Sequence, residues 1–335
     1  MRRTPLSAAH PALAGPAASR RPTFDHLLAV TALALVASTL AGFLGTSWWV
    51  FDLLANLRWH LAVLLAAVTI ASLLARRWTV ALLTLAGAAI NLIVVAPLLI
   101  GAPGPTSAPD AASLEVTFFN AKIRADKDAV IAYLEDRDDD VIVLAGTDRS
   151  WVEAMAASGL PLHVVSGGHL DPGLEILVMA RRPDAEVTAH KLTDHSRDVL
   201  VEVVIEGDGG PVHLLGTHPV SPKTPGRAQR RDLMLDWIGS WSSRRDAPVV
   251  VMGDLNATPW SASFETMLDQ GGLIDSQQRH GIQPSWPAAL GRLGLPIDHV
   301  LHSGELTTLE RELGPSFGSD HRMVHARLAR HSGRG

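Results

Sequence analysis

The chain has no cysteine among its 335 residues, and this absence excludes disulfide bonds, thiolate nucleophiles and cysteine-ligated zinc. A protein without cysteine is equally compatible with reducing and oxidising compartments, so other features must indicate its location. Basic residues are outnumbered after position 110, where 22 Lys and Arg stand against 31 Asp and Glu. Because affinity for nucleic acids comes largely from neutralising phosphates, this acidic balance disfavours nucleic acid as a partner.

Charged residues are nearly absent from three long apolar stretches near the N-terminus. The stretches cover residues 24–44, 57–75 and 79–100, and each is close to the ~20 residues needed to cross a hydrocarbon core. Tryptophans stand at their ends, where the amphipathic indole ring favours the membrane surface; these are Trp48, Trp49, Trp59 and Trp78. The sequence therefore predicts three transmembrane helices within residues 24–100.

Arginines flank these stretches unevenly. Two pairs, at 2–3 and 20–21, precede the first stretch, Arg76 and Arg77 separate the second from the third, and the loop 45–56 has no Lys or Arg. By the positive-inside rule, residues 1–23 are predicted to be cytoplasmic and everything after residue 100 extracytoplasmic. Residues 101–112, with three prolines, are predicted to be a linker. The prediction is a multi-pass protein of the cell membrane with an extracytoplasmic domain at 113–330.

Residues 113–330 have the pattern of a globular α/β domain. Apolar runs predict strands at 114–120, 141–145, 174–180, 199–205, 212–218, 249–254, 297–302 and 324–328. Amphipathic periodicity predicts helices at 127–137, 228–240 and 261–270. Strands and helices do not alternate regularly, which favours a mixed or antiparallel body of two sheets with helices outside, an α/β fold of the α+β type.

Polar motifs are predicted at the C-terminal ends of several of these strands. They are Gly-Thr-His at 216–218, Gly-Asp-Leu-Asn-Ala-Thr-Pro at 253–259, Ile-Asp-His-Val at 297–300 and Gly-Ser-Asp-His-Arg at 318–322, with Asn120 ending the first strand. Asp, His and Asn side chains serve divalent cations and general acid–base chemistry. Each motif alone is typical of a turn or a strand end, whereas their joint occurrence in this order predicts one site assembled from several strands.

In combination these motifs resemble those of the endonuclease/exonuclease/phosphatase superfamily, which is related to DNase I, apurinic endonucleases and neutral sphingomyelinases. The resemblance covers about residues 114–328 and implies a four-layer α/β/β/α sandwich of the DNase I-like type that hydrolyses phosphate esters or anhydrides. Three spans ahead of such a domain are similar to the membrane phosphatases associated with glycopeptide resistance, which act on lipid-linked pyrophosphate.

The resemblance implies a role for each catalytic candidate. His321 looks like the general base that activates water, with Asp298 orienting its imidazole. Asp254 and Asn256 would position the nucleophile and hold a phosphoryl oxygen. His218 would donate to the phosphate or protonate the leaving group.

A divalent cation is also implied by the resemblance, with Asp320 and Asn120 facing it. Hard oxygen ligands without thiolates point to Mg²⁺ or Mn²⁺. The chain departs from the family pattern, however, because Gly146 stands where the family has its principal ligand, a glutamate, and Lys122 stands where many members have an acidic residue. The missing ligand is replaced by Asp148 or by Glu175, or the ammonium of Lys122 replaces the charge of the metal; the sequence leaves these alternatives open.

Two functions remain compatible with these residues. The first is a membrane-anchored, metal-dependent phosphoesterase acting on a membrane lipid, such as a lipid pyrophosphate, or on a phosphorylated small molecule. The alternative is a catalytically degenerate domain that binds a lipid headgroup or a protein partner, which Gly146 and Lys122 favour. If Gly146 is not required by a tight backbone approach, Gly146→Glu is predicted to tighten Mg²⁺ or Mn²⁺ binding.

Overall fold

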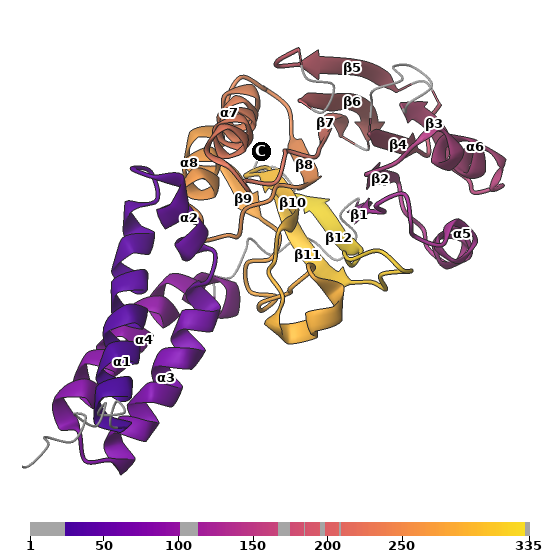
Figure 1. The fold of residues 1–335 in the computed structure, drawn as a ribbon. Coiled ribbons are helices and arrows are strands. Elements are labelled where there is room, and N and C mark those ends of the chain that lie inside the picture. The colour runs from indigo at the N-terminus through magenta and orange to yellow at the C-terminus, as the bar shows by residue number, and fades with distance from the viewer. Residues whose placement is uncertain are drawn as a thin grey trace, which may run out of the picture.

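The computed structural model describes residues 24–100, 113–166, 175–183, 185–194, 198–207 and 209–331. The predicted cytoplasmic segment 1–23 and the predicted linker 101–112 lie outside the described residues. The described part consists of an N-terminal group of helices and a larger body of sheets and helices, which Figure 1 shows side by side.

One sheet has six strands in the order β11-β12-β1-β2-β4-β3. Strands β1 and β2 are parallel, whereas β12 runs antiparallel to β1. The central strand β2 is buried along its whole length, as expected for a continuous apolar run covered on both faces. Its strands are β1 (Ser113–Asn120), β2 (Val141–Ala145), β3 (His163–Ser166), β4 (Ile176–Ala180), β11 (Leu306–Leu313) and β12 (Val324–Arg330).

The other sheet also has six strands, in the order β5-β6-β7-β8-β10-β9. Strands β7 and β8 are parallel, whereas β10 runs antiparallel to β8. The sheet therefore repeats the mixed pattern of the first, with one parallel pair at its centre. Its strands are β5 (Glu186–Lys191), β6 (Val199–Gly207), β7 (Gly210–Thr217), β8 (Val249–Asp254), β9 (Leu273–Asp275) and β10 (Asp298–Ser303).

The two sheets pack face to face over a core of β-branched and leucine side chains, among them Val143, Val201 and Val250. Helices cover the outer faces. Trp151 of α6 anchors the cluster outside the first sheet, and Trp241 of α7 lies in the cluster outside the second. The result is the two-sheet α/β sandwich predicted from the sequence. The covering helices are α5 (Lys127–Glu135), α6 (Arg149–Ala157), α7 (Pro225–Ser242) and α8 (Ala262–Gly271).

The strand directions correct one prediction about the motifs. Residues 216–218 and 253–259 follow β7 and β8 as predicted, but 297–300 and 318–322 stand at or before the starts of β10 and β12. They reach the same edge because these strands run antiparallel to their neighbours: Asp298 pairs with Asp254, and Val324 pairs with Phe118. The C-terminal end of one strand and the N-terminal end of an antiparallel neighbour meet at one edge.

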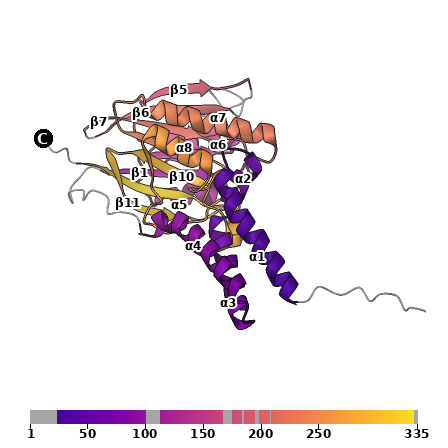
Figure 2. The same ribbon diagram turned by 90° about the vertical axis from the view of Figure 1, so that its left-hand side faces the viewer.

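The N-terminal helices form a bundle that projects from the sandwich (Figures 1 and 2). Two segments, Phe24–Leu44 and Trp78–Ile100, are long and apolar enough to cross a membrane. The second predicted span, 57–75, corresponds to a 17-residue helix, which qualifies only together with the preceding short helix, bent from it by 63°. The described helices thus provide two candidate spans, or up to three. They are α1 (Phe24–Ala41), η1 (Gly42–Leu44), α2 (Trp49–Ala55), α3 (Arg58–Leu74) and α4 (Trp78–Ile100).

Polar side chains join the helices inside the bundle. The guanidinium of Arg58 donates to the carbonyl of Thr39 at 2.8 Å, and the Asn91 amide donates to the Thr39 hydroxyl at 2.9 Å. The outer faces, in contrast, expose large apolar side chains such as Leu33 and Ile93. An apolar exterior over an internally bonded interior is the arrangement that a lipid environment favours.

Candidate active site

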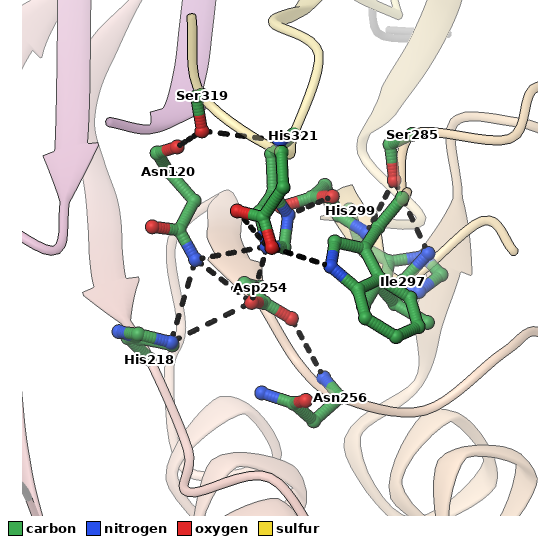
Figure 3. A network of polar contacts seen from close by, with 12 residues as sticks. Asn120, His218, Asp254, Asn256, Ser285, Ile297, His299, Ser319 and His321 are labelled. Carbon is green, nitrogen blue, oxygen red and sulfur yellow. Dashed lines mark hydrogen bonds and ion pairs between the residues drawn. The ribbon is translucent and has the colours of Figure 1, made fainter. Parts of the chain in front are cut away.

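A cleft of about 410 Å³ opens where the two sheet edges that carry the polar motifs meet. Asn120 ends β1 and His321 precedes β12 of the first sheet, while Asp254 ends β8 and His218 follows β7 of the second. Figure 3 shows these four side chains converging, with Asp254 between the other three. The sequence-predicted residues are therefore brought to one place from segments about 200 positions apart.

Asp254 is the centre of this arrangement. Its carboxylate accepts hydrogen bonds from the Asn120 amide at 2.9 Å and from the backbone N–H of Asn256 at 3.1 Å. Burial by itself raises the pKa of Asp254, but the charge of His321, the hydrogen bond and charge of His218, and the charge of Lys122 together hold it well below its usual range. Asp254 is therefore ionised although it is buried.

His321 and Asp298 form a buried pair. The Nδ1 of His321 donates to the Asp298 carboxylate at 2.9 Å, which leaves Nε2 facing the cleft, 3.6 Å from Asp254. Burial opposes the charged imidazolium, but the charges of Asp298 and Asp254 outweigh it and raise the pKa of His321 to about 9. The imidazole therefore holds its proton at neutral pH. Ser319 fixes the turn before it, accepting from the His321 N–H at 3.0 Å.

Asn256 and His218 complete the side of the cleft formed by the second sheet. Asn256 has a left-handed backbone, with φ of 50°, and its amide donates to the carbonyl of Pro219 at 3.0 Å. A non-glycine residue in this conformation is held by its surroundings and is common at functional sites. The Nε2 of His218 lies 3.5 Å from Asp254, and His218 lines the cleft.

The three predicted cation ligands do not come together. Asp320 lines the cleft, where its carboxylate accepts from the indole of Trp286 at 2.9 Å. The donor face of the Asn120 amide is committed to Asp254, and its buried oxygen has no hydrogen-bond partner. Asp148 is not among the residues that line the cleft; its carboxylate caps the start of α6 by accepting from the Trp151 N–H at 3.2 Å. Glu175, the alternative to Asp148, does line the cleft.

Gly146 lies against the segment that follows β1. Its φ is +63°, and a Cβ atom at this position would stand 2.8 Å from the Asn120 oxygen and 3.0 Å from the backbone nitrogen of Lys122. The N–H of Ile123 donates to the Gly146 carbonyl at 2.8 Å, which closes this approach. The backbone therefore requires glycine here, and the condition attached to the predicted Gly146→Glu gain is not met.

The described residues give a poor site for a divalent cation. The ligand atoms of Asp254, Asp298 and His321 lie within 4.8 Å of one another, a spacing that a metal ion needs. However, the His321 imidazolium already balances one of the two carboxylate charges, and Asp298 is occupied by the His321 Nδ1. Near Asn120, where the resemblance places the ion, Gly146 brings no carboxylate and Lys122 brings a positive charge. Asp320 and Glu175 also line the cleft, but among the described residues only Asp254, Asp298 and His321 are grouped at ligand spacing. Hard divalent cations need several anionic oxygens, so this group does not fit one.

Sequence patterns gave no signal for several groups that shape the cleft. Ser285 lies outside every motif, yet its hydroxyl accepts from the N–H of Asp298 at 3.2 Å. Leu53 and Asn56 belong to the N-terminal helical segment, yet they line the same cleft as Asp254. Such contacts join residues far apart in the chain, whereas the periodicity of apolar residues gives information only about local structure.

Comparison with known protein families agrees with the geometry. The model of the Endonuclease/Exonuclease/phosphatase family matches residues 118–321, which is more than half of the chain and contains every residue described in the cleft except Leu53 and Asn56. Among curated protein sequences, none matches the chain significantly.

Solved structures of low sequence identity share the fold. An endonuclease/exonuclease/phosphatase from Bacteroides vulgatus aligns with a TM-score of 0.54 at 17% identity, over 65% of this chain and 99% of its own. One from Beutenbergia cavernae gives 0.52 at 20% identity, over 66% and 72%. TDP2 from D. rerio, solved in complex with a single-strand DNA product, gives 0.53 at 17% identity, over 64% and 98%.

Proposed function

The chain belongs to the endonuclease/exonuclease/phosphatase family, and on that premise we propose that it hydrolyses phosphate esters or anhydrides in the cleft around Asp254. One observation carries the proposal: the buried His321–Asp298 pair faces Asp254 at the edge where Asn120 and His218 also converge. A domain that only bound a ligand would have no need of a buried proton-transfer pair beside an ionised carboxylate.

The chemistry proposed is the attack of water on phosphorus. The proton of the attacking water passes to the carboxylate of Asp254, because the His321 imidazole beside it already holds its own proton at neutral pH. Asp298 holds the imidazole in orientation through its hydrogen bond to Nδ1. As the phosphorus–oxygen bond to the leaving group breaks, His218 supplies a proton to the departing oxygen. Asn256 is placed to hold a phosphoryl oxygen.

Charge on the phosphate is proposed to be balanced by the chain's own cations. Lys122 lines the cleft, and its charge acts on both Asp254 and His321. Lys223 and Arg227 line the same cleft. Preorganised positive charge in a partly dry site stabilises developing negative charge. Because the residues do not fit Mg²⁺ or Mn²⁺, the ions implied by the family resemblance, no step of the proposed reaction uses a bound metal.

The substrate class follows from the surroundings of the cleft. Its walls combine the cations with apolar side chains, among them Leu53, Val220 and Leu295, and the segment bearing Leu53 belongs to the helical bundle. We propose a membrane-resident phosphate, such as a lipid pyrophosphate, with its charged end at Asp254. A nucleic acid is disfavoured by the acidic balance of residues 111–335, although a relative of the same fold was solved with a DNA product.

A cell-membrane location with the catalytic domain outside the cytoplasm is also proposed. Arg77, of the basic pair between the second and third predicted spans, forms an ion pair with Asp25 at the start of α1. The start of α1 and the connection between α3 and α4, which contains Arg76 and Arg77, lie together at the end of the bundle away from the sandwich (Figure 1). By the positive-inside rule that end is cytoplasmic. Protease added to intact cells is expected to digest residues 113–330, and digestion only after lysis would overturn this orientation.

The test of the function uses the full chain purified in detergent. Release of phosphate from farnesyl pyrophosphate, of nitrophenol from bis(4-nitrophenyl) phosphate and of nucleotides from DNA is compared with and without EDTA. We expect hydrolysis of the pyrophosphate in EDTA and its loss in His321→Ala by about 10²–10⁴-fold. If no substrate is hydrolysed at millimolar Mg²⁺ or Mn²⁺ and His321→Ala changes nothing, the binding function favoured by Gly146 and Lys122 replaces this proposal.

A further inference from the structure

Helix α2 connects the membrane helices to the sandwich through a buried carboxylate. Asp52 is 3% exposed, and it accepts hydrogen bonds from Arg231 of α7 at 2.7 Å, from the Ser261 hydroxyl at 2.8 Å and from the backbone N–H of Ala262 at 2.8 Å. The guanidinium of Arg231 is itself buried. A buried arginine needs a paired anion; Asp52 of the bundle supplies one at 2.7 Å, and the half-exposed Asp232 beside Arg231 supplies another at 2.6 Å.

These contacts reach the loop that carries Asp254 and Asn256. Arg231 uses a second nitrogen to donate to the backbone carbonyl of Asn256 at 3.0 Å. The side-chain oxygen of Asn56, at the end of α2, accepts from the backbone N–H of Thr258 at 2.8 Å. The Asn256 carbonyl is therefore bonded to Arg231, the partner of Asp52, and the Thr258 N–H is bonded directly to Asn56.

The same segment forms part of the cleft wall. Leu53 and Asn56 line the cleft together with Asp254, Asn256 and His321. Because Asn256 holds a left-handed backbone, its conformation depends on the contacts around it. Asp254 and Pro219 hold its N–H and its side-chain amide, while its carbonyl is held by Arg231, the partner of Asp52. Neither Asp52 nor Asn56 lies within residues 118–321, where the family model matches.

Further contacts keep the bundle in this position. The N–H of Gly281 donates to the carbonyl of Leu98 at 2.9 Å, and Trp260 packs against Val95 and Leu98 of α4. His60 of α3 donates to the carbonyl of Leu293 at 2.9 Å, in the short helix η2 (Ala288–Leu293). The contact of α2 is therefore part of a wider interface between the helices and the sandwich.

We propose that α2 is a working part of the active site, in which Asp52 and Asn56 are positioning residues for the loop that bears Asp254 and Asn256. This inference rests on the proposed function and adds that the membrane helices do more than hold the domain at the membrane. They set the geometry of the loop, so turnover depends on the bundle being docked. Small displacements of positioned groups cost rate rather than binding.

The test measures kcat and KM separately for full-chain variants in detergent, with farnesyl pyrophosphate as substrate. Asn56→Ala removes the acceptor for the Thr258 N–H, whereas Asn56→Asp keeps an oxygen there and is the conservative rescue. We expect Asp52→Asn and Asn56→Ala to lower kcat about 10- to 100-fold, with KM nearly unchanged and Asn56→Asp close to the parent protein.

Asn91→Ala is the matched control. Asn91 is a fully buried amide of the bundle that bonds to Thr39 and lies outside the cleft lining. We expect this variant to lose thermal stability and to keep the parent kcat. Unchanged kcat in both α2 variants, or an equal fall in Asn91→Ala, would overturn the inference.

Hydrogen exchange separates this inference from the proposed function. In the parent protein the amides of Asn256 and Thr258 are expected to exchange slowly, and Asn56→Ala is expected to speed the exchange at Thr258 at least about tenfold, the protection of a hydrogen bond being lost. If the parent shows no hydrolysis, the function fails, while this measurement still decides whether α2 holds the loop. Unaltered exchange in Asn56→Ala would refute the positioning role whatever the activity.

Discussion

The two edges that form the cleft differ in how far they keep the chemistry that the family resemblance implies. The edge of β7, β8 and β10 carries His218, Asp254, Asn256 and Asp298 in bonded contact. The edge of β1 and β2 keeps Asn120 but has a glycine and a lysine where carboxylates are implied. The groups that handle water and protons are thus retained, while those that hold a cation are replaced.

This difference has a local physical cause. After β1 the chain turns through two residues with positive φ, Lys122 at 50° and Ile123 at 45°. The turn brings the backbone of Lys122 so close to Gly146 that a side chain there has no room. The glycine at 146 and the lysine at 122 therefore belong to one local backbone arrangement. Substitutions at the edge of β8 test proton transfer, and substitutions at the edge of β1 and β2 test charge balance.

The largest effect is expected on the edge that is retained. Asp254→Asn keeps the shape of the side chain but removes its charge, and we expect kcat to fall about 10²–10⁴-fold. Asp275→Asn is the control, because Asp275 is also a buried acid of the second sheet but pairs with His299 outside the cleft lining. Steady-state kinetics of both variants check this. A similar fall in both would show that the loss reflects folding.

A smaller effect is expected at Lys122. Lys122→Met removes the ammonium at similar length, and we expect kcat/KM in EDTA to fall about 10- to 100-fold, with Lys122→Arg retaining most of it. Lys191→Met, at an exposed lysine of β5, is the matched control and is expected to behave as the parent. Loss of parent activity in EDTA and its return with Mn²⁺ would contradict the assignment of charge balance to Lys122.

Gly146→Glu tests whether the cation side can be restored. Sequence alone predicted tighter metal binding for this substitution, provided that the backbone tolerated it. With φ at +63° and a Cβ contact of 2.8 Å, we expect a loss of about 1–3 kcal/mol in unfolding free energy and no gain in Mn²⁺ affinity. Denaturant unfolding and Mn²⁺ titration calorimetry measure the two quantities. Micromolar Mn²⁺ binding by the variant would show that the turn rearranges.

The last effect concerns stability away from the cleft and leaves turnover at neutral pH unchanged. Burial and the charge of Arg137 lower the pKa of His325 to about 3. Above pH ~6.5 the histidine is neutral in both states, and below it only the unfolded chain gains the proton, so stability falls as pH falls toward 3. We expect a loss of up to about 1.4 kcal/mol per pH unit below 6.5. His325→Gln should reduce this slope, and His163→Gln, at an exposed site, should not.

Much of the sandwich was predictable because its central strands are continuous apolar runs. The bounds of β2 and β8 agree with the sequence prediction at both ends, and the predicted catalytic residues converge. Strands β5 and β11 were missed because they lie at sheet edges, where exposed polar residues such as Glu186 interrupt the apolar alternation. Asp148 was taken for a ligand because sequence does not distinguish a helix cap from a metal ligand.

The contributions of the bundle to the site were beyond prediction for another reason. Asp52 and Asn56 are two polar residues in a loop between apolar stretches, a place where polar residues are ordinary. Their partners, Arg231 and Thr258, stand in a helix and a turn whose local patterns are satisfied without them. Only the three-dimensional structure shows that Asp52 pairs with Arg231 and that Asn56 accepts a hydrogen bond from Thr258.

The ion pair of Asp52 and Arg231 joins positions 179 residues apart, so Asp52 is synthesised well before its partner. A ribosome adding about 5–20 residues per second needs about 10 to 40 seconds to make the intervening chain. During the synthesis of these residues Asp52 has no ion pair with Arg231, and the loop after β8 has not yet been made. The contacts of α2 with Arg231 and with the loop after β8 therefore form only after the second half of the chain has been made and packs against the first.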